Sequence, residues 1–219
     1  MVTIGDGASA RAVSVLLDDL FVSPPTWPHT TATGELGPAV SRISRERGAS
    51  MLLIGMKSPM EQRNKTVELA RWSPIPVLAV PSHMSALPRR ALLALDFREP
   101  SLYAANTALR LLARPAVACM VSASPRQPPE PHVGLLFDAV ENGFGADPEL
   151  TITRHTVAGE PAAALLQFAT AQSVDLIALG RCGRTAATYG NPGSMGHVAR
   201  AILAATPCSV LSALSSNLT

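Results

Sequence analysis

Residues 174–194 read VDLIALGRCGRTAATYGNPGS, a short apolar run followed at once by a segment that contains four glycines. An apolar run of this length that ends in glycine is typical of a buried strand in a parallel sheet. In open α/β sheets, ligands bind at the carboxyl ends of the strands, and Gly180 lies at such an end. Glycine lets a backbone approach a ligand closely or adopt positive φ. The segment is therefore either a binding loop or a flexible connection.

A related pattern occurs earlier in the chain. Residues 34–55 (GELGPAVSRISRERGASMLLIG) align without a gap with residues 159–180 (GEPAAALLQFATAQSVDLIALG), at an offset of 125 positions. Each segment predicts a helix, a turn and a buried strand. Residues 73–80 (SPIPVLAV) correspond to residues 206–213 (TPCSVLSA) at an offset of 133, so the second copy is eight residues longer between its strands. This period indicates a duplicated domain rather than an array of short repeats.

The second copy has the pattern of a complete doubly wound domain. Strands are expected at residues 90–96, 116–123, 150–157, 174–180 and 208–213, and helices near 101–112, 133–143, 160–172 and 195–205. Strands that alternate with helices favour a parallel sheet covered on both faces. We therefore expect an α/β protein with two doubly wound parallel-sheet units, the first of them incomplete.

The boundaries of these units follow from composition. We expect a truncated first unit at residues 1–82, a polar linker at 83–88, and a complete second unit at 89–219. Residues 1–33 are either a shortened first strand that ends at Asp6 with its helix, or only the helix before the next strand.

Composition limits the possible partners and compartment. The net charge is +2 over 219 residues, with the basic residues scattered, which argues against a nucleic-acid surface or a polybasic membrane anchor. No stretch approaches the roughly 18 consecutive apolar residues of a membrane span, and the first residues lack the order of a signal peptide. Three cysteines without a CxxC pair fit a reducing compartment. We expect a cytoplasmic protein that binds a small ligand and other proteins.

The glycine segment has features of an anion site. Ser194 is expected to be the N-cap of the last helix, whose free N–H groups can bind an anion such as phosphate. Arg181 and Arg184 flank the segment and could add charge-assisted contacts, although a surface position is favoured for Arg181. His197 is the one histidine expected near the anion. No acid or histidine lies at catalytic spacing from Cys182, and the histidines show no metal-ligand spacing, so we expect no catalytic or metal residues.

The four positions Gly180, Gly183, Gly193 and Ser194 have the spacing G-2x-G-9x-G-S. This spacing resembles the motif of the ATP-binding branch of the universal stress protein family. The resemblance covers residues 88–213 well and residues 34–80 recognisably. It implies a tandem protein of Rossmann-like units, similar to adenine nucleotide alpha hydrolases, with a degenerate first unit.

The resemblance also implies a binding site. Asp96, at the end of the first strand of the second unit, and the backbone of Val121, in the next strand, would hold the adenosine end. Ribose and phosphates would be held by the motif and its neighbours, which are Leu179, Gly180, Gly183, Gly193, Ser194 and Met195, and we add Arg184 to these. The first unit lacks counterparts of three motif residues, so we expect no phosphate site there.

In this family the last strand commonly pairs across a dimer. The strands IPVLAV (75–80) and CSVLSA (208–213) are therefore expected to pair within the chain as an intramolecular pseudo-dimer, with a further homodimer as an additional possibility.

The resemblance predicts a stress-response protein that binds ATP or another adenine nucleotide, with or without Mg²⁺. It would act as a nucleotide-dependent regulator of an unknown protein partner rather than as a fast catalyst. The alternatives are a structural or interaction module that binds no nucleotide, a slow ATPase, and an adenylyl-transfer enzyme, for whose second substrate the sequence shows no signature.

Overall fold

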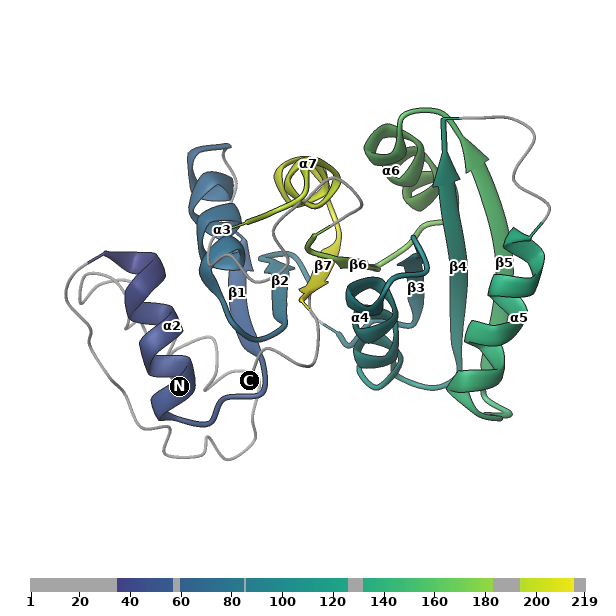
Figure 1. Cartoon of the computed structure of the whole chain (residues 1–219), viewed down its shortest axis with the longest axis horizontal. Coiled ribbons are helices and arrows are strands. Elements are labelled where there is room, and N and C mark those ends of the chain that lie inside the picture. Colours follow the sequence, from purple (N-terminus) through teal and green to yellow (C-terminus); the bar gives the residue numbers. More distant parts are fainter. Residues whose placement is uncertain (1–34, 57–59, 85, 126–131, 183–193, 215–219) are drawn as a thin grey trace.

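The structure is a computed structural model that describes residues 35–56, 60–84, 86–125, 132–182 and 194–214 (Figure 1). The described residues form a seven-stranded sheet in the order β1-β2-β7-β6-β3-β4-β5. Its strands are β1 (Leu52–Met56), β2 (Val77–Pro81), β3 (Arg90–Ala94), β4 (Ala116–Ser124), β5 (Leu150–Ala158), β6 (Leu176–Gly180) and β7 (Ser209–Ala213). The helices are α2 (Leu36–Glu46), α3 (Met60–Trp72), α4 (Glu99–Leu109), α5 (Val133–Phe144), α6 (Pro161–Ala171) and α7 (His197–Ala205).

The predicted fold class is confirmed. Every strand and helix expected after residue 89 is present within a few residues of its expected bounds. Sequence analysis did not assign α3, which occupies the place where the second copy has its glycine segment and α7. The two alternatives for residues 1–33 lie outside the described residues.

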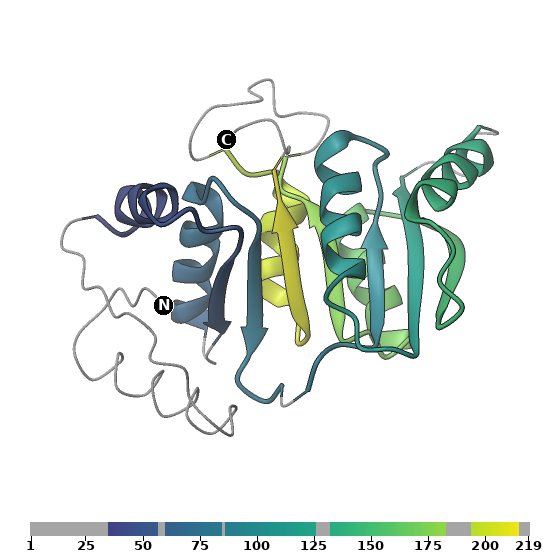
Figure 2. The ribbon, with the colours of Figure 1, turned by 90° about the horizontal axis from the view of Figure 1, so that it is seen from below.

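The N-terminal part, residues 35–84, and the C-terminal part, residues 86–214, contribute to the same sheet. β2 pairs with β7 in antiparallel orientation, and the other five strand pairs are parallel (Figure 2). The pairing expected between residues 75–80 and 208–213 is thus present. It makes the sheet continuous from β1 to β5, while the division into two duplicated units remains a prediction.

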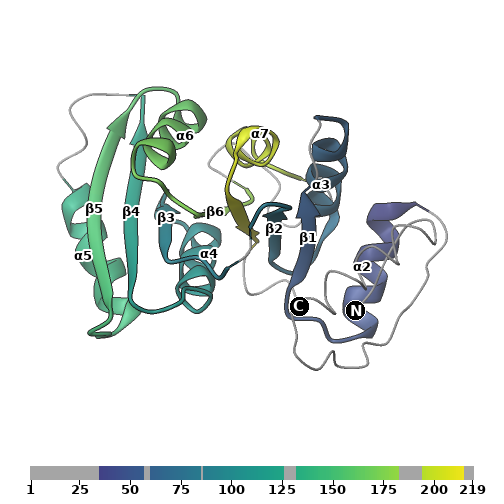
Figure 3. The same cartoon turned by 180° about the vertical axis from the view of Figure 1, so that it is seen from behind.

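Helices cover both faces of the sheet (Figure 3). One face packs against α3, α6 and α7, in a core cluster that contains Ala70, Leu165 and Ile202. The opposite face packs against α4 and α5, in a cluster that contains Ala104 and Phe137. Because alternate residues of a strand point to opposite faces, the strands of the sheet interior are apolar at nearly every position.

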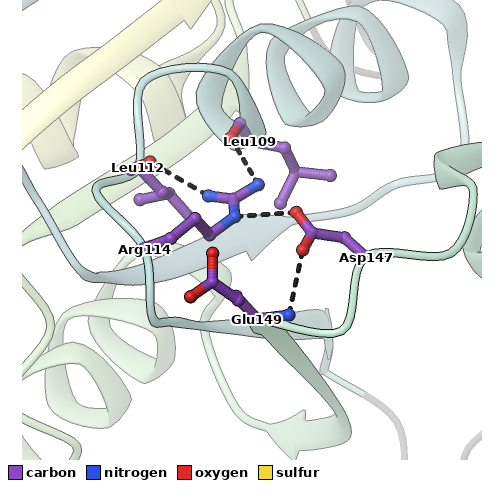
Figure 4. Close-up of polar contacts among 5 residues, drawn as sticks. All are labelled: Leu109, Leu112, Arg114, Asp147 and Glu149. Atoms are coloured by element: carbon purple, nitrogen blue, oxygen red, sulfur yellow. Dashed lines mark hydrogen bonds and ion pairs between the residues drawn. The ribbon is translucent and has the colours of Figure 1, made fainter.

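At the amino edge of the parallel strands, Arg114 caps the end of α4 (Figure 4). Its Nε donates to Asp147 Oδ2 at 2.8 Å, and its two terminal nitrogens donate to the carbonyls of Leu112 at 3.0 Å and Leu109 at 3.2 Å. The hydrogen bond from Arg114 and a second one from the Glu149 amide hold the pKa of Asp147 below its usual value. This arginine therefore satisfies helix carbonyls and has a carboxylate partner.

Candidate functional site

Three residues form a row across β6, β3 and β4, near the carboxyl ends of these strands. The register pairs Leu179 with Ala94, and Ala94 with Val121. All three are buried in the cluster on the face of α6 and α7. The structure therefore brings the predicted residues Leu179 and Val121 to one end of one face, with Ala94 between them.

Asp96 lies two residues beyond Ala94 and is exposed at this edge. Its Oδ1 accepts a hydrogen bond from the Arg98 amide at 3.1 Å, which closes a tight turn. Phe97, inside this turn, has a φ of 59° and packs edge-on against Phe137, with ring centroids 5.2 Å apart. A non-glycine residue in this conformation costs about 1–3 kcal/mol, and such strain is common at functional sites. Oδ2 of Asp96 has no hydrogen bond from a described residue and is available to a ligand.

The backbone of Val121 is partly engaged in the sheet. Its carbonyl accepts a hydrogen bond from the Leu95 amide at 2.9 Å. A carbonyl oxygen has two lone pairs, so that of Val121 can accept one further bond from a ligand.

Gly180 ends β6, and its small size is required by a neighbouring helix. A Cβ atom at Gly180 would lie 2.9 Å from the backbone nitrogen of Ser101 and 3.0 Å from Pro100 Cβ, both in the first turn of α4. Among the described glycines, positive φ occurs at Gly48, Gly145 and Gly159, and not at Gly180. Glycine is therefore needed at position 180 because α4 packs closely against the backbone there, and not because of a positive φ.

The expected surface position of Arg181 is wrong. The residue is only 2% exposed, and its Nη1 donates to the carbonyls of Ala70 and Ser73, the second at 2.5 Å. Both acceptors lie at the carboxyl end of α3, where the last carbonyls of a helix lack intrahelical partners. Burial lowers the pKa of Arg181 to about 10, so the side chain stays protonated at neutral pH. Sequence analysis missed this contact because its partners lie more than 100 positions away.

Ser194 is not the N-cap of the last helix. α7 begins at His197 after the N-cap Gly196, which as glycine provides no side-chain cap. The reason is that the preceding residues run beside the end of β6: the Gly196 amide donates to the Arg181 carbonyl at 2.8 Å, and Cys182 Sγ lies 3.4 Å from Ser194 Oγ. Met195, between them, packs against the same cluster as Leu179.

The N-terminus of α6, unlike that of α7, is satisfied by a side chain. Glu160 accepts hydrogen bonds from the amides of Ala162 at 3.2 Å and Ala163 at 2.9 Å. The Ala163 and Ala162 amides, and then nearby His197, hold the pKa of Glu160 below its usual value. His197 Nε2 lies 3.7 Å from Glu160 Oε1, which brings the starts of the two helices together. Sequence analysis missed this cap, although Glu160 directly precedes a proline at the helix start, which is a usual N-terminal signal.

The remaining predicted binding residues, Gly183, Arg184 and Gly193, lie outside the described residues. Within the described ranges, no three His, Cys, Asp or Glu side chains group as metal ligands. In the same ranges, no helix combines the length and the apolar character that crossing a membrane requires.

Comparison with known proteins places this geometry in a family. The model of the universal stress protein family matches residues 88–212, which is more than half of the chain. The chain belongs to the universal stress protein family. Its fold is similar to that of a universal stress protein from Archaeoglobus fulgidus DSM 4304, with a TM-score of 0.65 and 16% identity over 95% of this chain and 78% of that chain.

A protein assigned as a universal stress protein from Pseudomonas aeruginosa UCBPP-PA14 is similar to the same degree. Its TM-score is 0.65 and its identity 14%, over 99% of this chain and 82% of that chain. At 14–16% identity, the similarity to these two solved structures shows that this chain has the same fold as they do. A search of curated proteins finds no significant match.

Proposed function

We propose that the C-terminal part of this universal stress protein binds ATP or another adenine nucleotide at the carboxyl edge of its sheet. The observation that carries the proposal is the N-terminus of α7. Its N-cap is Gly196, which has no side chain to cap it, it lies against the end of β6, and it follows the G-2x-G-9x-G-S spacing of residues 180–194. Amides of a first helical turn that lack a cap are suited to bind phosphate.

Two features of this helix favour an anionic ligand, and they act beside the Glu160 carboxylate, which lies 3.7 Å from His197 Nε2. The helix dipole contributes about 0.3–1 kcal/mol for each charge at an exposed site. Arg181, whose carbonyl accepts from the Gly196 amide at the start of α7, has a buried side chain that is protonated at neutral pH. Glu160 caps the N-terminus of α6, whereas the N-cap of α7 is a glycine, so we assign the ligand to α7.

The other residues have roles suited to a nucleoside. Oδ2 of Asp96 would accept a hydrogen bond from a hydroxyl or amino group, and the Val121 carbonyl would accept one from the base. Leu179 and Met195 would supply apolar contact. From the spacing alone, we assign phosphate binding to Gly180, Gly183, Gly193 and Ser194, with a contact from Arg184. When bound, the nucleotide supplies negative charge and a hydrogen-bonding base edge.

We further propose that the protein is a cytoplasmic nucleotide-dependent regulator rather than a fast catalyst, with Mg²⁺ accompanying the nucleotide if it is present. The described residues contain no cluster of acidic and imidazole side chains that would hold a metal for hydrolysis. A bound nucleotide would then stabilise one conformation for a protein partner to recognise.

Calorimetric titration with ATP, ADP and AMP, each with and without Mg²⁺, tests this function. We expect one site per chain in the wild type, and loss of binding in Gly193→Val, which replaces the last glycine of the G-2x-G-9x-G-S spacing. A phosphate-release assay on the same samples separates a binder from an ATPase. Absence of binding by folded protein that carries no co-purified nucleotide would contradict the proposal and favour the interaction module.

A further inference from the structure

We propose that Arg181 is a positioning residue, through which the N-terminal part of the chain holds the end of β6 and the start of α7 in the geometry that binds the nucleotide. This inference rests on the function proposed above. It assigns to the N-terminal part a role in ligand affinity.

The backbone of Arg181 joins three elements. Its amide donates to the Ala213 carbonyl at the end of β7 at 2.7 Å, and its carbonyl accepts from the Gly196 amide at 2.8 Å. Gly196 is the N-cap of α7. The position of residue 181 therefore fixes where the chain leaves β6 and where α7 begins.

The side chain of Arg181 extends this connection to α3. Its Nη1 donates to the carbonyls of Ala70 and Ser73 at the end of that helix. A cation is favoured there because the carboxyl end of a helix carries partial negative charge. Since α3 belongs to the N-terminal part, this contact ties the start of α7 to the first half of the chain.

The guanidinium of Arg181 is buried without a carboxylate partner among the described residues, which is unusual for an arginine with a purely structural role. Nε of Arg181 is buried without a hydrogen-bond partner, and no carboxylate of the described residues forms an ion pair with its guanidinium. Arg114 also caps a helix end, but it is paired with Asp147. A buried cation without an anion is costly, so its retention calls for a compensating interaction. A phosphate at the nearby start of α7 would supply the missing negative charge.

The first copy shows that packing does not require this charge. At the offset of 125 positions, Gly180 corresponds to Gly55 and Arg181 to Met56. Met56 is 6% exposed and belongs to the core cluster that contains Ala70. A buried side chain at this point of the strand can thus be apolar, and arginine is found in the copy that carries the glycine segment.

The variants Arg181→Met, which introduces the residue of the first copy, and Arg181→Lys, which keeps the charge, test this inference. Arg114→Met is the matched control, because it removes a helix-capping arginine at the opposite edge of the sheet. Arg181→Gln replaces the methionine variant if that variant does not fold, since glutamine retains a donor for the α3 carbonyls without the charge. For each protein we would measure the thermal midpoint, the Kd for ATP, and the deuterium uptake of residues 196–200 without nucleotide.

We expect Arg181→Met to weaken ATP binding about tenfold or more, within the usual range of coupling between sites, and to raise deuterium uptake at the start of α7. Arg181→Lys should restore most of the affinity. Arg114→Met should lower the thermal midpoint and leave both the Kd and the uptake at wild-type values.

Three results would overturn the inference. They are a wild-type Kd in Arg181→Met, unchanged uptake at residues 196–200, and an equal loss of affinity in Arg114→Met, which would indicate general destabilisation. If the folded wild type binds no adenine nucleotide, the proposed function fails by itself. The uptake then decides the positioning role alone: an increase in Arg181→Met supports it, and no change excludes it.

Discussion

Leu78 of β2 lies directly opposite Leu211 of β7 in the antiparallel pair, and the two residues are 133 positions apart in the sequence. Val77 pairs with Ser212, and Ala79 with Val210. At the offset of 133, Val77 corresponds to Val210 and Ala79 to Ser212. Val77 thus pairs with the counterpart of Ala79, and Ala79 pairs with the counterpart of Val77. The register therefore has a local two-fold axis that passes between Leu78 and Leu211, as two copies of one unit facing each other would have.

This symmetry predicts how the C-terminal part behaves alone. A protein of residues 88–219 would expose the edge of β7 that β2 covers in the full chain. Because an apolar strand with an unpaired edge associates readily with another strand, we expect this fragment to form a homodimer through β7. Size-exclusion chromatography with light scattering would measure its mass, and a folded monomer at micromolar concentration would contradict the prediction.

Gly180→Ala should destabilise the protein. The added Cβ would lie 2.9 Å from the backbone nitrogen of Ser101, and backbone at the start of a helix cannot move away as easily as a flexible side chain. We expect a loss of about 1–3 kcal/mol in the free energy of unfolding, as is usual for overpacking. Denaturant unfolding would measure this loss.

Gly55→Ala is the matched control for that substitution. Gly55 aligns with Gly180 at the offset of 125 positions, and a Cβ atom at Gly55 meets nothing within 4 Å. The free energy of unfolding of Gly55→Ala should stay within about 0.5 kcal/mol of the wild-type value, as for most surface substitutions. Equal losses in the two variants would show that the contact with α4 is not the reason for glycine at 180.

Much of the fold could be predicted because it depends on local pattern. The apolar run before Gly180 predicts β6, and the correspondence of residues 73–80 with 206–213 predicts strands where β2 and β7 lie. The burial of Arg181 could not be predicted, because an arginine after a strand ordinarily lies in solvent and its acceptors belong to a distant helix. The start of α7 was misplaced for a similar reason. Ser194 is a good N-cap by type, but Gly196 occupies the N-cap and its amide bonds to the Arg181 carbonyl, 15 positions earlier in the chain.

The cap of α6 predicts a dependence of stability on pH. The bonds from Ala163 and Ala162 hold the pKa of Glu160 below its ordinary value of 4.5, so the folded state binds the proton less readily than the unfolded state. Stability from this cap is thus fully present above pH 4.5 and is lost as pH falls through the lowered pKa.

Glu160→Gln should remove this part of the dependence. We expect a lower thermal midpoint than the wild type at pH 7, and a difference between the two proteins that narrows toward pH 3. Thermal melting curves, monitored by circular dichroism across this pH range, would measure the difference in thermal midpoint. Other acids titrate in both proteins, so their effects cancel in this difference. A constant difference at all pH values would exclude Glu160 as a charged cap.

Nucleotide binding is proposed for the C-terminal part of the chain and not for the N-terminal part. The most direct test counts the bound molecules, by native mass spectrometry of the full chain with increasing ATP. We predict that binding saturates at one nucleotide per chain. No bound nucleotide on folded protein would contradict the assigned function, and two per chain would contradict the assignment of the site to one half.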